Sequence, residues 1–136
     1  MATDWNAPAI VSAVRRGALK GVMIGIGIVE ARAVYLITQT KKSGRIYRRR
    51  GVKHQSSAPG EPFANDTGET LKRRDTTLDA AHIRATLHFR SINAARMEHG
   101  TRKMRPRPFA RRAISETRSQ VTDAVLGSIV AELKSL

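Results

Sequence analysis

Apolar and small residues recur every three or four positions at both ends of this chain, and this spacing most constrains its fold. In the first segment, residues 8–40, they are Ile10, Val14, Ala18, Val22, Ile26, Val29, Ala33 and Ile37. A period of 3.6 residues places them on one helical face, so the sequence predicts a long helix. Asn6 suits its N-cap and Pro8 its first turn.

Four glycines lie inside this predicted helix, at positions 17, 21, 25 and 27. Each should cost about 1 kcal/mol relative to alanine in a helix interior. They indicate either close backbone packing against another element or subunit, or a break near Gly25. The sequence leaves both explanations open.

The most apolar stretch, residues 21–29, lies between Lys20 and Glu30. A membrane-spanning helix needs roughly 20 apolar residues, so this stretch is too short. Glu30 and Arg32 also interrupt the cleavage region that an export signal would need. We therefore expect a buried amphipathic helix and no membrane contact.

The middle of the chain has strand and turn signals instead. Residues 41–53 carry seven cations and no acid, with turn residues Ser43, Gly44 and Gly51, which predicts a basic strand or hairpin arm. Residues 54–68 are rich in Ser, Pro, Gly and Asn, so residues 41–68 as a whole are expected to protrude. Asp66 or Thr67 should cap a short helical turn at residues 69–73.

A strand is expected at residues 82–89, where Ile83, Ala85, Leu87 and Phe89 alternate with polar residues. Residues 92–98 predict a short helix that Gly100 ends in a left-handed cap. Prolines at 106 and 108 make residues 102–109 an extended approach to a last helix. The apolar stripe of that helix comprises Phe109, Ala113, Ile114, Thr117, Val121, Val125, Ile129, Val130 and Leu133.

Together these elements predict an α+β fold in a single domain, residues 1–136. It has a long N-terminal helix, a small antiparallel sheet with an extended basic arm, and a C-terminal helix.

The charge balance favours a binding or assembly protein over an enzyme. Lysines and arginines number 25 against 11 acids, which gives a formal net charge of +14. Such self-repulsion opposes compaction unless an anionic partner relieves it. The absence of cysteine excludes disulfides and thiolate zinc sites. The scattered histidines and acids form no metal-binding or catalytic pattern, and Gly25-Ile26-Gly27 lacks the third glycine of a dinucleotide turn. We expect no enzyme activity, cofactor or metal.

Half of the positive charge lies in two short acid-free runs, residues 41–53 and 102–112, which we expect to contact nucleic acid or an acidic protein surface. The residues expected to make this contact are Lys41, Lys42, Arg45, Arg48, Arg49, Arg50, Lys53, Arg102, Lys103 and Arg105. Few aromatic residues accompany them, so contact with the phosphate backbone is favoured over base stacking. A solvated basic surface is the plain alternative.

Four motifs in order resemble a known family. They are Ser43-Gly44-Arg45-Ile46-Tyr47-Arg48, the stretch from His54 to Pro62, Asp66-Thr67-Gly68, and Met97-Glu98-His99-Gly100-Thr101 followed by Arg107-Pro108-Phe109. Over residues 41–115 the chain resembles tailed-phage head–tail joining and tail-completion (neck) morphogenesis proteins. One departure is Asn93-Ala94-Ala95-Arg96, which stands where the family usually has an aromatic-Ala pair.

The resemblance implies a structural virion protein at the head–tail junction, present in the host cytoplasm during assembly. It implies a ring around the DNA channel (a hexamer, with a dodecamer as the alternative), adjoining connector and tail proteins, and backbone contact with packaged double-stranded DNA. The implied arm and subunit-interface residues are Ala58, Pro59, Gly60, Glu61, Pro62, Glu98, Gly100, Thr101, Arg107, Pro108 and Phe109. The alternative function is a cellular basic nucleic-acid-binding protein of ribosomal or nucleoid type, and a small hydrolase ranks third.

Overall fold

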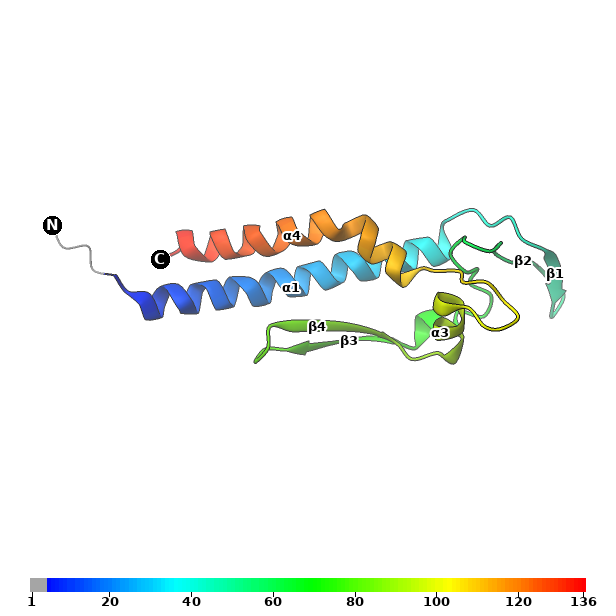
Figure 1. Ribbon diagram of the computed structural model, residues 1–136, viewed down its shortest axis with the longest axis horizontal. Coiled ribbons are helices and arrows are strands. Elements are labelled where there is room, and N and C mark those ends of the chain that lie inside the picture. Colours follow the sequence, from blue (N-terminus) through cyan, green and yellow to red (C-terminus); the bar gives the residue numbers. More distant parts are fainter. Residues whose placement is uncertain (1–4) are drawn as a thin grey trace.

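The computed structural model describes residues 5–136 and shows two long antiparallel helices with two β-hairpins (Figure 1). The elements are α1 (Ala7–Thr38), β1 (Ile46–Arg49), β2 (Val52–Gln55), α2 (Glu69–Lys72), β3 (Arg74–Asp79), β4 (Arg84–Phe89), α3 (Ile92–His99) and α4 (Ala110–Lys134). The predicted α+β class is confirmed, but the strands form two separate two-stranded sheets instead of one.

α1 begins as the sequence predicts, since Ala9 N donates to Asn6 Oδ1 at 3.2 Å. The helix continues through Gly25 without a break. A Cβ placed on Gly21 would lie 2.4 Å from Val125 Cα, and one on Gly17 would lie 2.5 Å from Ile129 Cα. The two backbones therefore approach so closely that these positions have no room for a side chain. Close packing is therefore the correct explanation for Gly17, Gly21 and Gly25, whereas Gly27 is exposed and packs against nothing.

Ion pairs on one side of this helix pair link α1 to α4. Arg16 Nε lies 3.0 Å from Glu132 Oε2, and Lys20 also pairs with Glu132. Further along, Arg32 Nε lies 2.5 Å from Glu116 Oε2. We call the paired helices, residues 7–29 and 114–134, the stalk.

The other end of the molecule holds an aromatic core, and we call residues 30–73 and 89–113 the head. Phe109, Leu36 and Ile37 are the largest apolar side chains that are almost fully buried. The Phe109 ring makes edge-to-face contacts with Phe63 at 5.0 Å and Phe89 at 4.9 Å between centroids. These contacts join the loop after β2, the end of β4 and the start of α4.

The β3–β4 hairpin runs along α1 on the side opposite α4 (Figure 1). It is attached at both ends, because Arg74 Nε lies 2.7 Å from Glu30 Oε1 and Arg15 donates to the carbonyl oxygens of Ala80 and Ala81, each at 3.1 Å. The sequence did not predict β3, since Arg74–Asp79 is mostly polar and lacks apolar alternation. Ile83, predicted inside a strand, lies in the turn with a φ of 50°.

Three local predictions need correction. The N-cap of α2 is Gly68, which has no side chain; Thr67 Oγ1, one residue earlier, accepts from Glu69 N at 3.4 Å, and Asp66 takes no part in the cap. Gly100 ends α3 with a φ of 76° and a ψ of 179°, which differs from the predicted left-handed helical cap. Ile114, Val130 and Leu133 were expected on the buried stripe of α4 but are exposed.

Candidate functional site

Much of the first basic run lies on the β1–β2 hairpin, where Arg48 and Lys53 share one face. Arg48 stands directly opposite Lys53 in the antiparallel register, so two like charges face each other. Arg50 occupies the turn with a φ of 51°, a left-handed conformation that is costly for arginine. Opposed like charges and a strained turn both destabilise a hairpin that stands alone. A bound polyanion would relieve the charge repulsion.

Asp66 supports the opposite face of this hairpin. Its Oδ2 accepts from Arg49 Nη1 at 2.8 Å and from the Tyr47 hydroxyl at 3.2 Å, and its Oδ1 lies 3.4 Å from His54 Nδ1. The hydrogen bond from Arg49 is the main reason that the pKa of Asp66 lies below its usual range. Arg49, predicted as an anion contact, is therefore already paired within the chain. The predicted capping role of Asp66 is replaced by this one.

Lys42 is also engaged internally. Its ammonium group donates to Leu36 O at 2.9 Å and to Thr40 Oγ1 at 2.6 Å, at the C-terminal end of α1. Burial lowers its pKa, although the nearby Glu61 acts in the opposite direction. Lys42 thus satisfies a free carbonyl at a helix end, where a cation also complements the helix dipole.

The second basic run lies at the same end of the molecule as the first (Figure 1). Thr101 and Met104 form an isolated antiparallel bridge, which presents the residues between them to solvent. Gly60 N donates to Pro106 O at 3.1 Å and so links the loop that follows the first run to the segment that carries the second. Runs about 50 residues apart in the sequence therefore share one end of the head.

Eight of the predicted contact residues have side chains without a hydrogen bond or ion pair in the described part of the chain. They are Lys41, Arg45, Arg48, Arg50, Lys53, Arg102, Lys103 and Arg105, and we call them the basic end. All eight lie in the β1–β2 hairpin or in loop segments. Their free charges make this end the candidate binding surface.

The segment Ala58–Pro62, predicted as an arm laid on a neighbour, is held against its own chain. Glu61 accepts from Ala58 N at 2.8 Å and from Ser43 N at 3.0 Å, and it also accepts from the Ser43 hydroxyl. The hydrogen bond from the Ser43 hydroxyl is the first of several that lower the pKa of Glu61 from its ordinary 4.5 to about 2. Pro62 is buried, whereas Pro59 and Gly60 stay exposed. Neighbour contact through these two residues remains a prediction.

Glu98 fixes the start of α4. Its carboxylate accepts from the backbone N–H groups of Phe109, Ala110 and Arg111 at 2.9–3.0 Å. Only 7% of the residue is exposed, and the Arg111 side chain covers it with an ion pair of 3.0 Å. Burial opposes its ionisation most strongly, but these four donors outweigh burial and lower the pKa. Helix ends leave such N–H groups free, so Glu98 acts as a cap supplied from α3.

The other residues implied by the resemblance surround this cap. Gly100 is required at the turn because a Cβ there would lie 2.8 Å from Met104 O. Arg107 N donates to Met97 O at 2.7 Å, which sets the direction of the chain before Pro108 and the buried Phe109. Thr101 is exposed. In this structure most of these residues therefore serve the head's own folding, and their predicted contact with a second subunit is untested.

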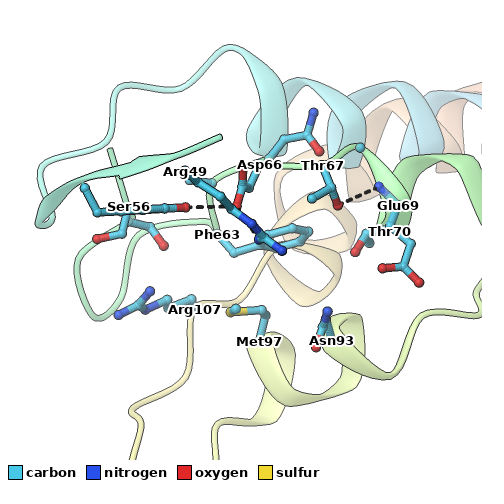
Figure 2. A pocket seen from close by; sticks show the side chains of 15 residues that line it. Arg49, Ser56, Phe63, Asp66, Thr67, Glu69, Thr70, Asn93, Met97 and Arg107 are labelled. Atoms are coloured by element: carbon cyan, nitrogen blue, oxygen red, sulfur yellow. Dashed lines mark hydrogen bonds and ion pairs between the residues drawn. The ribbon is translucent and has the colours of Figure 1, made fainter. Parts of the chain in front are cut away.

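A cavity of about 260 Å³ lies between the loop after β2, α3 and the strand-like segment before α4 (Figure 2). Figure 2 shows Met97, Asn93 and Arg107 on one side of it, facing Phe63, Arg49 and Asp66. Within the described residues, Ser57 Oγ and Arg107 Nε are buried side-chain atoms without a hydrogen-bond partner. The charges around the cavity are balanced, since its wall includes Arg49 and Arg107 together with Asp66 and Glu69.

Residues 5–136 contain no group of three His, Cys, Asp or Glu side chains placed to hold a metal ion. His82 and His88 are bound separately, to Asp79 and Thr77. The expected lack of catalysis and cofactors stays a prediction.

The stalk leaves large apolar side chains in solvent on both helices. Ile24 is 53% exposed and Tyr35, just beyond the stalk, is 47% exposed. On α4 the exposed residues are Ile114, Leu126, Val130 and Leu133. A single chain therefore leaves apolar stalk surface uncovered, as proteins do at interaction sites.

By length and composition alone, α1 is long and apolar enough to cross a membrane. One 18-residue window has a mean hydropathy of 1.6, with 28% of the window buried. The sequence estimate considered only the uncharged stretch 21–29, whereas this window includes two charges at most. Core helices of soluble proteins and signal sequences meet the same criterion, so the expected lack of membrane contact remains a prediction.

Comparison with known proteins gives no match to any family model, curated protein or solved structure.

Proposed function

We propose that this chain is a structural subunit of the head–tail junction of a tailed phage and that it assembles there as a ring around the DNA channel. The observation that supports this proposal most is the division of the molecule. The basic end carries eight cations without internal partners, and the stalk exposes apolar residues that one chain leaves uncovered. A ring subunit needs neighbours for its apolar surface and an anion for its charge. The resemblance of residues 41–115 supplies the phage context.

In this proposal the basic end contacts either the DNA backbone or acidic faces of adjoining connector and tail proteins. Arg48 and Lys53 are the most informative pair to change. They face each other across the hairpin, and neither side chain makes a hydrogen bond or ion pair within the described residues. If both contact phosphates, reversing both charges should lower DNA affinity and reduce the salt slope by about two. The matched control is the double reversal of Arg84 and Arg118, which are exposed, unpaired cations outside the basic end.

The DNA test has two informative results. Filter binding or fluorescence anisotropy with duplex DNA over a salt series should show a lower slope for Arg48→Glu/Lys53→Glu than for Arg84→Glu/Arg118→Glu. Equal slopes would remove DNA from the proposal and leave acidic proteins as the partner of the basic end.

The ring test is electron microscopy of the purified protein, alone and with phage tails, together with mass spectrometry of mature virions. Rings of fixed symmetry are expected when the protein is mixed with phage tails, and the protein is expected in mature virions. If virions lacked the protein, the proposal would fail. The alternative, a cellular nucleic-acid-binding protein, predicts a monomer or dimer whose DNA or RNA binding depends strongly on salt.

A further inference from the structure

The C-terminal half of α4 carries a narrow stripe of exposed side chains. Asp123, Leu126, Val130 and Leu133 follow one another at spacings of three, four and three residues. Such spacing keeps side chains on one helical face, as in a coiled coil. Leu126 is 57% exposed, Val130 47% and Leu133 36%. The stripe is separate from the contact with α1, which uses Val121, Val125 and Ile129 opposite the glycines.

Charges without partners lie at the two ends of this stripe. Asp123 makes no hydrogen bond or ion pair, whereas every other acid in residues 5–136 makes at least one. Lys134, at the end of α4, is also exposed and unpaired. Eleven residues separate them, about 16 Å along the helix, so they cannot pair with each other within one chain.

We propose that this stripe pairs with the same stripe of a second copy, with the two α4 helices antiparallel. In this arrangement Leu126 packs against Val130 of the second copy, and Asp123 lies beside its Lys134. Both pairings have the same midpoint near Ser128, so one two-fold axis satisfies them together and each contact occurs twice.

The positions of Asp123 and Lys134 favour a second copy of this chain as the partner and an antiparallel direction for the two helices. An acid at one end, a base at the other and apolar residues between them are self-complementary when the helix is reversed. A parallel pair would place Asp123 beside Asp123 and Lys134 beside Lys134, which is unfavourable. The stripe therefore specifies a second copy of the same chain, in the antiparallel direction.

Repulsion between two strongly basic chains does not prevent this contact. The midpoint lies about 19 residues from the start of α4, so each head is about 28 Å away from it along the helix. The two basic ends are then several times farther apart than the Debye length of about 8 Å at physiological salt. Their mutual repulsion is largely screened.

This inference does not depend on the proposed phage function. A two-fold contact joins two copies and stops, so it cannot by itself build a ring of more than two. Ring assembly would use other faces of the stalk, and the α4 dimer would be the form of the free protein before assembly.

Analytical ultracentrifugation of the full chain over a wide concentration range tests the proposal. We expect a reversible monomer–dimer equilibrium. Asp123→Lys should raise the dissociation constant roughly tenfold, because two modest attractions become repulsions. The charge swap Asp123→Lys/Lys134→Asp should restore it to within about twofold of the original protein.

Thr76→Lys is the control, because Thr76 is exposed on β3, which lies on the other side of α1 from α4. It should leave the dissociation constant unchanged. Leu126→Asp tests the apolar part and should abolish the dimer while circular dichroism shows unchanged helix content. A protein that stays monomeric, a dimer insensitive to Asp123→Lys, or a charge swap that does not restore pairing would overturn the inference. None of these results concerns the presence of the protein in virions, so the two proposals fail separately.

Discussion

The head and the stalk are held together in different ways. In the head, three phenylalanine rings meet and a buried carboxylate satisfies the free N–H groups of α4. In the stalk, the backbone of α1 at Gly17 and Gly21 lies against the backbone of α4, because neither glycine carries a side chain. The head therefore depends on its aromatic contacts and on an acceptor for buried N–H groups. The stalk depends on glycines, whose lack of a side chain lets the two backbones approach.

This difference accounts for the distribution of apolar surface. Helices that meet through glycine leave little space between them for large residues, so Ile24, Leu126 and Val130 lie outside the contact. The head instead collects its apolar side chains from loops, β4 and both long helices into one core. The head thus has a buried core of its own, whereas the stalk leaves several large apolar side chains exposed.

The largest expected effect comes from removing the buried carboxylate of the head. Glu98→Ala leaves three N–H groups of α4 and the Arg111 guanidinium without their acceptor, which should cost about 3 kcal/mol of unfolding free energy. Urea unfolding monitored by circular dichroism measures this loss. The control Glu69→Ala removes only an exposed ion pair with Arg73 and should change stability by less than about 0.5 kcal/mol. Similar losses for both variants would show that the cap does not hold the head together.

A methyl group added to the stalk contact should have the next largest effect. Gly21→Ala places a Cβ against the backbone of Val125 and should destabilise the protein by about 2 kcal/mol, because overpacking outweighs the gain in helix propensity. Gly27→Ala is the control on the same helix, since nothing lies within 4 Å of its added Cβ. It should stabilise by about 1 kcal/mol. Denaturant unfolding measures both changes. If Gly21→Ala and Gly27→Ala changed the free energy of unfolding in the same direction, the close contact at Gly21 would be contradicted.

A change in the basic end should have a smaller effect of opposite sign. Arg50→Gly removes a side chain from a left-handed backbone conformation and should stabilise the hairpin by about 1 kcal/mol. It should also weaken DNA binding, because one free cation is lost. Arg48→Gly removes the same charge from a strand, where glycine gives no such gain. If Arg50→Gly lowered the free energy of unfolding, the left-handed backbone conformation at residue 50 would not be a source of strain.

The smallest change appears only in acid. The pKa of Glu61 is lowered by hydrogen bonding to about 2 in the folded state, against an ordinary value of 4.5. Because the folded-state value is the lower one, the stability that Glu61 contributes is present above about pH 4.5. It is lost as the pH falls toward 2. Unfolding curves of the original protein and Glu61→Gln, measured across this range, should converge in acid. Parallel curves would show that Glu61 does not titrate with folding.

The long helices could be predicted from the sequence because their apolar spacing extends over many turns. Asn6 and Pro8 marked the start of α1 correctly, and the predicted C-terminal helix matches α4 closely. The choice between a break and a close contact at Gly25 could not be made, because glycine is compatible with both and only the facing residues distinguish them. Ile114 and Val130 were assigned to the buried stripe because a period alone does not tell how wide a buried face is.

The polar parts of the fold were harder to predict. β3 lacks apolar alternation, so its pairing with β4 depends on a neighbour that the local sequence does not indicate. Asp66 looked like a helix cap because it precedes a short helix, yet it binds Arg49 and Tyr47 across the loop. The basic residues of the candidate site could be identified, but which of them are free depends on such long-range partners. Lys42 and Arg49 are the examples.

The unbroken course of α1 also fixes a dimension. Its 32 residues correspond to about 48 Å of rigid rod, and the same helix contributes residues to the head at one end and to the stalk at the other. Any particle that incorporates this chain keeps about that distance between the head and the layer where α1 begins.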